Sequence, residues 1–248
     1  MLVSPSWACK KLAFYFIMGR IKSEQDIWIK TAEAIPMHIT VLIGAKNTFC
    51  KGAIMNKQNI IEFFDRLAPN WDDGVHRDDN VINTILDNAG ITEKVSVLDV
   101  GCGTGVLISD YLKRSAAQVT GIDISEKMIK IAKEKFPDPR VLFICGDAET
   151  IRFGKTFDCC VIYNAFPHFP EPYSLIKNLA ASVKQGGKLT IAHGSSRESI
   201  DRHHMEHAGS VSLKLMSDDE LASLLAPYFD ISVNISNSRM QQIVGVKK

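Results

Sequence analysis

Residues 97–107 read VLDVGCGTGVL, an apolar run that contains one acid and continues into three glycines at alternate positions. The apolar part is typical of a buried strand, and the glycines allow a sharp turn directly after it. Asp99 comes two residues before Gly101, and Gly103 and Gly105 follow. A carboxylate this close would repel the pyrophosphate of a dinucleotide, so a cofactor with a cationic end is favoured.

Strands and helices alternate from Met55 to the end of the chain. We expect helices over 59–68, 80–90, 105–114, 125–136, 171–184 and 218–228, and strands over 95–100, 118–123, 141–147, 157–164, 188–193, 229–236 and 240–247. Near-continuous apolar strands between helices predict an α/β fold, a doubly wound and mostly parallel sheet with helices on both faces. The last two strands are joined by a short polar turn, so we expect them to pair antiparallel.

Residues 1–54 are predicted to be a loosely ordered N-terminal extension, and residues 55–248 to be one domain. The apolar runs in the extension are too short to span a bilayer. The six cysteines include no CxxC pair, which indicates reduced thiols and a cytoplasmic protein. Three of them are expected to be buried in strands: Cys145, Cys159 and Cys160.

The formal net charge of +1 and the lack of a polybasic run disfavour a broad surface for nucleic acid. We therefore expect no nucleic-acid partner. We also expect no membrane partner, and a monomer or homodimer; a small-molecule partner is implied by the resemblance described below.

Two further acids follow the second and third predicted strands. Asp123 could accept hydrogen bonds from two ribose hydroxyls, and Asp147 one from an adenine amine, with the Ala148 N–H available to a ring nitrogen. Carboxyl ends of parallel strands share the edge where open α/β sheets bind ligands. S-adenosylmethionine, with a sulfonium and an ammonium for Asp99, fits this series. The alternatives are a plain glycine turn, a helix-capping role for Asp123 and an Asx turn for Asp147.

The segments VLDVGCGTG, GIDISEKMIKIAKEKFP, ICGDAE, FDCCVIYNAFPHFPEP and KQGGKLTIAHG occur in this order. Together they resemble the class I S-adenosylmethionine-dependent methyltransferases, and most closely the ubiquinone/menaquinone-biosynthesis-like branch that acts on small molecules. The resemblance runs from about Asn59 to the C-terminus. It implies a seven-stranded sheet whose last strand is antiparallel, and methyl transfer to a small molecule.

The predicted cofactor-binding residues come from the motifs and from this resemblance. In FFDRLAPNWDD, Trp71 stands where the branch usually has a tyrosine that closes over the cofactor. The full set is Trp71, Asp99, Gly101, Cys102, Gly103, Gly105, Asp123, Ile124, Met128, Asp147, Ala148 and Asn164.

The acceptor is expected beyond the fourth and fifth strands, where NAFPHF offers Asn164 and His168. The Asn-Ala-Phe-Pro sequence departs from the Asn/Asp-Pro-Pro-aromatic motif of the related enzymes that methylate amino groups of nucleic acids or proteins. The chain has no Pro-Cys dipeptide, which cytosine-C5 methylases use as nucleophile. Both observations argue against those chemistries.

The most individual segment is HGSSRESIDRHHMEHAG, residues 193–209, which holds four of the seven histidines. We expect residues 194–216 to form a lid over the acceptor pocket. If residues 197–207 are helical, His203 and His207 share one face. A metal would need a third ligand from His193, His168 or Glu206, so we predict no metal site.

A histidine that acts as base or contacts the acceptor is favoured, because imidazole titrates near neutral pH. The candidates are His168, His203, His204 and His207. Arg197 and Arg202 nearby suggest an acidic acceptor. The alternative is a solvated polar lid without direct chemistry.

Three rival functions remain. A nicotinamide-dependent oxidoreductase is disfavoured by the glycine spacing and by Asp99. A non-catalytic cofactor-binding sensor or partner subunit rests only on the unusual acceptor side. A tRNA-modifying methylase is disfavoured by the near-neutral charge.

Overall fold

The computed structural model describes residues 55–74 and 77–248. The predicted extension, residues 1–54, lies outside the described residues.

Within this part of the chain, seven strands form one sheet in the order β3-β2-β1-β4-β5-β7-β6. The pairs among β1 to β5 are parallel, and β7 runs antiparallel to both of its neighbours. This confirms the predicted fold class, with the last strand antiparallel. The strands are β1 (Ser96–Val100), β2 (Gln118–Asp123), β3 (Val141–Cys145), β4 (Phe157–Tyr163), β5 (Val183–His193), β6 (Phe229–Ser236) and β7 (Gln241–Lys247).

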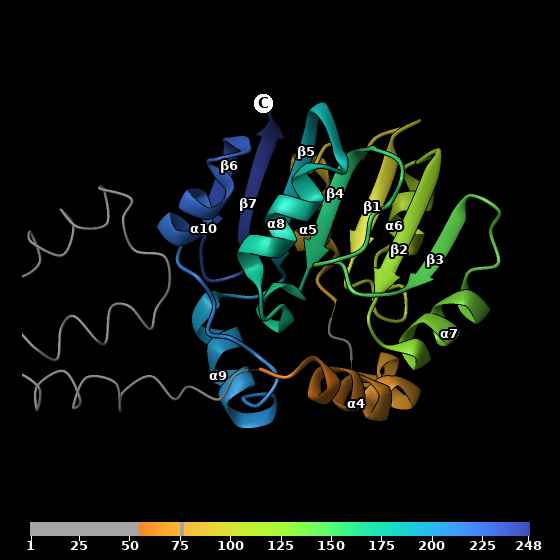
Figure 1. The fold of residues 1–248 in the computed structure, drawn as a ribbon, viewed down its shortest axis with the longest axis vertical. Coiled ribbons are helices and arrows are strands. Elements are labelled where there is room, and N and C mark those ends of the chain that lie inside the picture. Colours follow the sequence, from red (N-terminus) through yellow and green to blue (C-terminus); the bar gives the residue numbers. More distant parts are fainter. Residues whose placement is uncertain (1–54, 75–76) are drawn as a thin grey trace, which may run out of the picture. The chain divides into compact units, whose positions relative to one another are not determined.

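Helices cover both faces of the sheet (Figure 1). One core cluster joins α8 and α10 to the sheet, and a second joins α5, α6 and α7 to the opposite face. Apolar side chains at helical spacing on these helices and buried side chains at consecutive positions of the inner strands β1 and β4 produce this double packing. The helices are α4 (Lys57–Leu67), α5 (Asp79–Asn88), α6 (Ile108–Lys113), α7 (Glu126–Lys135), α8 (Pro172–Ala180), α9 (Arg197–His207) and α10 (Asp218–Leu225).

Polar side chains at the N-caps fix where several helices begin. Ser125 accepts a hydrogen bond from the Met128 N–H at the start of α7. Ser196 caps α9 in the same way, and Ser217 forms a capping box with Glu220 at α10.

Three sequence-based predictions were wrong. The helix expected over 171–184 ends at Ala180, and β5 already begins at Val183. The pairing of β5 with β4 is irregular at this point, and the left-handed Gly186 (φ +73°) lies in the strand rather than in a turn before it. The helix expected from residue 105 begins only at Ile108. Cys145 is exposed because β3 is an edge strand, whereas Cys159 and Cys160 are buried as predicted.

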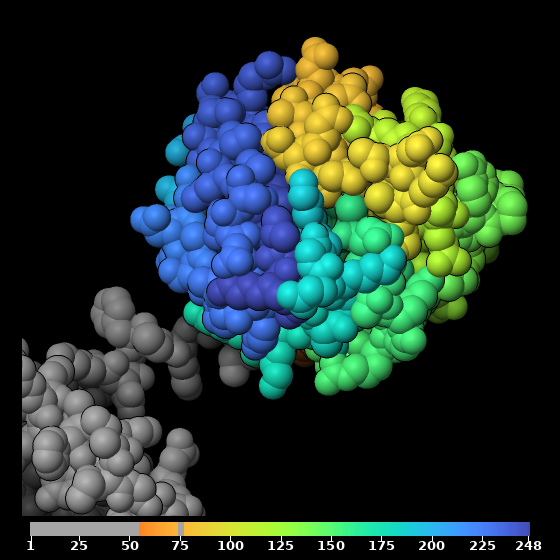
Figure 2. All heavy atoms as spheres, turned by 90° about the horizontal axis from the view of Figure 1, so that it is seen from above, coloured from red at the N-terminus to blue at the C-terminus, as the bar shows by residue number. Residues whose placement is uncertain are grey.

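The carboxyl ends of the parallel strands face α4 and α9, which lie below the sheet in Figure 1. Ile60 of α4 packs against Ala208 and Val211, which follow α9. The opposite end is seen in Figure 2, where cyan atoms lie between the dark blue C-terminal part and the green part of the domain, in agreement with the place of β5 between β7 and β4. None of the described helices combines the length and apolar character that crossing a membrane requires.

Candidate active site

A pocket lies at the carboxyl edge of the parallel strands, between the strand ends and α4. Most of the predicted cofactor residues line it. They are Trp71, Asp99, Gly101, Cys102, Gly103, Asp123, Ile124, Met128, Asp147, Ala148 and Asn164. Gly105 lies in the same loop but is not one of the lining residues. The role of each residue toward a cofactor stays a prediction.

The glycines are required by the turn that follows β1. Gly101 has φ +70°, and its N–H donates to the Ile122 carbonyl oxygen at 2.8 Å. A Cβ at this position would lie 2.6 Å from the Cβ of Ala165. Gly105 has φ +90°, and a Cβ there would lie 2.7 Å from the Phe136 ring. Both the left-handed backbone and the lack of space exclude a side chain.

Asp99 is a buried acid with free hydrogen-bonding capacity. Its side chain is at the pocket, the residue is only 3% exposed, and its Oδ2 has no hydrogen-bond partner among the residues described. Burial raises the pKa of the Asp99 carboxyl to about 7, the charge of Asp123 adds to this, and the Tyr111 hydroxyl counteracts it. A buried unpaired carboxylate is costly, so the site favours a cationic ligand group.

Asp123 holds the glycine loop in place. Its Oδ2 accepts the Gly103 N–H at 2.9 Å, and its Oδ1 accepts the Ser125 N–H at 2.9 Å. Burial raises the pKa of the Asp123 carboxyl, and these backbone donors work against that rise. A carboxylate offers about four acceptor positions, so Asp123 can still accept ligand hydroxyls.

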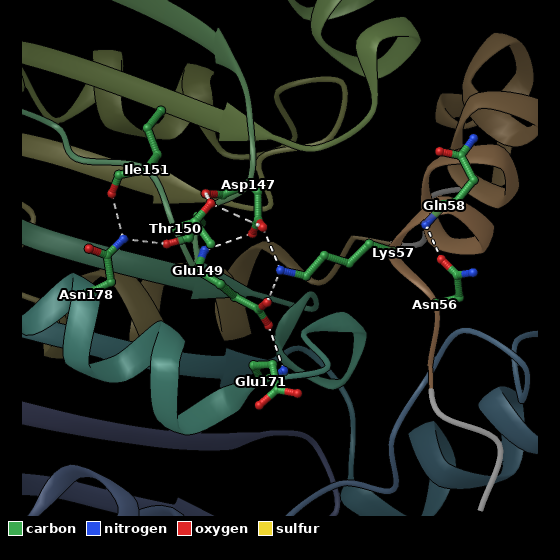
Figure 3. A network of polar contacts seen from close by, with 10 residues as sticks. Asn56, Lys57, Gln58, Asp147, Glu149, Thr150, Ile151, Glu171 and Asn178 are labelled. Carbon is green, nitrogen blue, oxygen red and sulfur yellow. Dashed lines mark hydrogen bonds and ion pairs between the residues drawn. The ribbon is translucent and has the colours of Figure 1, made fainter.

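Asp147 has a partner that the sequence did not reveal. Its Oδ2 lies 2.5 Å from Nζ of Lys57, which also lies 2.5 Å from Oε2 of Glu149 (Figure 3). Lys57 and Glu149 both line the pocket. No sequence pattern links a lysine in the first turn of α4 to acids 90 residues away.

Aromatic rings in contact with one another line part of the pocket. Phe64 of α4 packs edge-on against Trp71 at 5.7 Å between ring centroids and against His168 at 4.9 Å. All three line the pocket. This arrangement suits a reaction that excludes water.

Asn164 and Arg77 shape the pocket beside the glycine loop. Asn164 adopts a left-handed backbone (φ +52°), and its Oδ1 accepts the Gly194 N–H at 2.9 Å. It thereby joins the ends of β4 and β5. Arg77, which the sequence did not point to, donates to the Val106 carbonyl oxygen at 2.7 Å and pairs with Asp110 at 3.0 Å.

His168 is the predicted catalytic candidate that lines the pocket. It lies in the 3-10 turn η3 (Phe166–His168), and its Nδ1 is 2.9 Å from the Val211 carbonyl oxygen. A carbonyl only accepts, so Nδ1 carries the proton and Nε2 is left as an acceptor. Burial lowers the pKa of His168 to about 4; the bond to Val211 works against this, and nearby His204 adds to it.

The other three candidate histidines, His203, His204 and His207, lie on α9, whose predicted helical range is confirmed. His204 packs against His168 with ring centroids 5.1 Å apart, while His203 and His207 stack on each other at 4.7 Å. His203, His204 and His207 are not pocket-lining residues. No group of three metal-ligating side chains occurs in the described part of the chain.

The segment after α9 is tied to η3. The Leu213 N–H donates to the Pro167 carbonyl oxygen at 2.7 Å, and Val211 accepts from His168. The predicted lid is therefore anchored beside the pocket. Whether it acts as a lid stays a prediction.

The fold and the pocket together define a Rossmann-like domain with a pocket at the strand ends, the edge where open α/β sheets bind ligands. Comparison with known proteins agrees. Residues 97–187 match the methyltransferase domain family. This match agrees with the resemblance of the chain to the class I S-adenosylmethionine-dependent methyltransferases.

Two curated relatives illustrate the match. A malonyl-[acyl-carrier protein] O-methyltransferase of Priestia megaterium is 28% identical over 152 residues, which are 58% of this chain and 56% of the relative. A ubiquinone biosynthesis O-methyltransferase of Coxiella burnetii is 41% identical over 96 residues, 38% of this chain and 41% of the relative. The chain thus matches about half the length of these relatives.

Two solved structures share the fold. The complex of the Haloferax volcanii Trm112 methyltransferase activator with a putative methyltransferase matches with a TM-score of 0.65 and 18% identity, over 75% of this chain and 96% of that one. The magnesium protoporphyrin IX methyltransferase of Synechocystis PCC 6803 with bound SAH matches with a TM-score of 0.60 and 17% identity, over 78% of this chain and 100% of that one.

Proposed function

We propose that this protein binds S-adenosylmethionine and transfers its methyl group to a small-molecule acceptor. The observation that carries the proposal is Asp99, a buried carboxylate at the foot of the glycine loop whose Oδ2 has no partner within residues 55–74 and 77–248. Such a group fits the cationic end of this cofactor and repels a pyrophosphate.

In this proposal, three acids of the chain each contact a different part of the cofactor. Asp99 faces the ammonium, Asp123 accepts the ribose hydroxyls, and Asp147 receives the adenine amine. Phe64 and Trp71 shield the pocket from water. When bound, the cofactor supplies a methyl group activated by its sulfonium, so the protein mainly aligns the acceptor and removes a proton where one must leave.

His168 is the group proposed to meet the acceptor. It lines the pocket, its Nδ1–H is used by Val211, and its Nε2 can accept a hydrogen bond from an acceptor hydroxyl. The curated relatives methylate malonyl-[acyl-carrier protein] or act in ubiquinone biosynthesis. An oxygen acceptor on a small molecule agrees with both.

We place the reaction in the cytoplasm, with a monomer or homodimer as the active species and no nucleic acid or membrane partner. The net charge of +1 supports the exclusion of tRNA. A Trm112-bound neighbour makes a protein activator the alternative partner to test.

Two measurements test the proposal. Calorimetry with S-adenosylhomocysteine and with NAD should show binding of the first alone. Release of S-adenosylhomocysteine from S-adenosylmethionine, measured against phenols, thiols, quinols and tRNA, should then show turnover with a small molecule. Binding of NAD alone would contradict the proposal. Cofactor binding without turnover on any acceptor would favour the sensor or partner-subunit interpretation.

A further inference from the structure

The Lys57 ammonium joins two parts of the pocket that are far apart in sequence. It lies in the first turn of α4 and contacts both Asp147 and Glu149 at 2.5 Å. These two acids belong to the loop after β3, the nucleoside end of the pocket. Figure 3 shows the lysine side chain reaching from α4 across to this loop.

The loop itself is firmly attached to α8. Glu149 accepts the backbone N–H of Glu171 at 2.7 Å, and Asn178 donates to the carbonyl oxygens of Ala148 and Ile151 at 2.7 Å each. The Glu149 side chain is only 1% exposed. The loop that carries Asp147 and Glu149 is therefore held in place by α8, and the ion pairs of Lys57 connect α4 to this loop.

Lys57 carries the positive charge that these carboxylates need. Partial burial lowers the pKa of Lys57, but the hydrogen bonds and charges of Asp147 and Glu149 outweigh this and raise it overall. Asp147 retains room for a ligand: Oδ1 accepts the Glu149 N–H at 2.9 Å, and Oδ2 accepts Lys57 at 2.5 Å and the Thr150 hydroxyl at 3.3 Å. An amine can share this carboxylate with Lys57, because a carboxylate has about four acceptor positions.

The helix that Lys57 holds is a wall of the pocket. Lys57, Ile60 and Phe64 all line it. The middle of α4 rests on Ala208 and Val211 through Ile60, an apolar contact. The ion pair therefore secures the N-terminal end of this wall, next to the adenine position.

We propose that Lys57 is a positioning residue that fastens α4 across the nucleoside end of the pocket and so controls release of the bound cofactor. This inference rests on the proposed function, since it assumes a nucleoside cofactor. It predicts that loss of Lys57 changes the rate of cofactor dissociation and the KM for S-adenosylmethionine, and leaves the rate of the methyl-transfer step unchanged.

The test uses the full-length protein and the double variant Lys57→Met/Glu149→Gln, which removes the cation together with the buried anion. The amide oxygen of the introduced glutamine would still accept the Glu171 N–H. We expect S-adenosylhomocysteine to dissociate about tenfold faster, because one partly exposed charged tether is lost. The KM for S-adenosylmethionine should rise similarly, while kcat at saturating cofactor stays unchanged.

Two matched variants separate fastening from folding. Lys57→Arg keeps a cation that can reach both acids and should release the ligand at the wild-type rate. Asn59→Ala, on the exposed side of the same helix, should also behave like wild type. If the double variant does not fold, Lys57→Gln takes its place with the same expectation. Wild-type dissociation in a folded variant without the cation would overturn the proposal.

A ligand-free measurement keeps the two proposals distinguishable. If the wild-type protein binds no S-adenosylhomocysteine, the proposed function fails. Hydrogen exchange of the α4 amides then tests the fastening alone. Faster exchange in Lys57→Met/Glu149→Gln than in Asn59→Ala would support it, and equal protection would contradict it.

Discussion

The Asp123 carboxylate accepts the backbone N–H of Gly103 at 2.9 Å, which joins the end of β2 directly to the glycine loop after β1. The same side chain accepts the N–H of Ser125 at the start of α7. Asp123 therefore fixes both the glycine loop and the start of α7, which border the pocket. From the sequence, ribose binding and capping were alternatives for Asp123, but the geometry makes them compatible.

Replacing Asp123 by Ala should weaken S-adenosylhomocysteine binding by about 1.5–3 kcal/mol, the range for a hydrogen bond to a charged group. The glycine loop also loses one of its hydrogen bonds to β2, so the thermal midpoint should fall. Calorimetry measures the first effect and a thermal melt the second. The exposed Glu93→Ala is a control for loss of an acid. An unchanged dissociation constant together with a lower midpoint would leave Asp123 a purely structural role.

The stability of the ligand-free protein should depend on Asp99 through pH. Burial raises the pKa of its carboxyl to about 7 from 3.8. Between these values the folded state holds a proton that the unfolded state has lost, so this contribution to stability falls as pH rises toward 7. Asp99→Asn cannot titrate and should flatten this part of the profile. Melts from pH 4 to 8 on both proteins measure it, and identical profiles would contradict the raised pKa.

Ligand binding should show the opposite trend with pH. A cationic ligand group stabilises the ionised Asp99 carboxylate, so affinity for S-adenosylhomocysteine should increase as pH rises to about 7 and then level off. Calorimetry in buffers of different ionisation enthalpy should detect release of a proton near pH 6. Asp99→Asn should bind more weakly and without this dependence. A pH-independent affinity in the wild type would place the ammonium elsewhere.

Removal of residues 1–54 should leave the fold and cofactor binding intact. Within the described residues, 55–74 and 77–248, seven strands form the sheet and the pocket-lining residues begin at Lys57. Thermal melts and calorimetry of the full and shortened chains test this. A shortened chain that fails to fold would show that the extension supports the core.

The succession of strands and helices along the chain was predictable, as were most of the predicted cofactor residues that line the pocket, because both depend on local signals. Apolar runs, caps such as Ser125 and the glycines at 101 and 105 each determine the backbone within a few residues. Lys57 was not predictable, because its partners lie 90 residues away and any surface lysine has the same local pattern. The start of β5 at Val183 was missed for a similar reason: its pairing with Phe157 in β4, a long-range contact, overrides the helical pattern of 171–184.

The four candidate histidines lie at different distances from the pocket, so we expect their substitution to lower kcat to different degrees. His168 lines the pocket, His204 packs on its ring at 5.1 Å, and the exposed His203 and His207 contact each other. Once a substrate is known, His168→Ala should lower kcat by about a hundredfold if Nε2 takes the acceptor proton. Cofactor affinity should change little, because Asp99, Asp123 and Asp147 remain in place.

The α9 substitutions decide whether this segment is a catalytic lid. His204→Ala removes the ring beside His168 and should give an intermediate loss of kcat, whereas His203→Ala and His207→Ala should lie near wild type if they face water. A large loss in either of the latter would show that α9 moves toward the acceptor during turnover. Wild-type kcat in all three variants would contradict the lid hypothesis and leave α9 as a solvated polar helix, in keeping with its lack of buried residues.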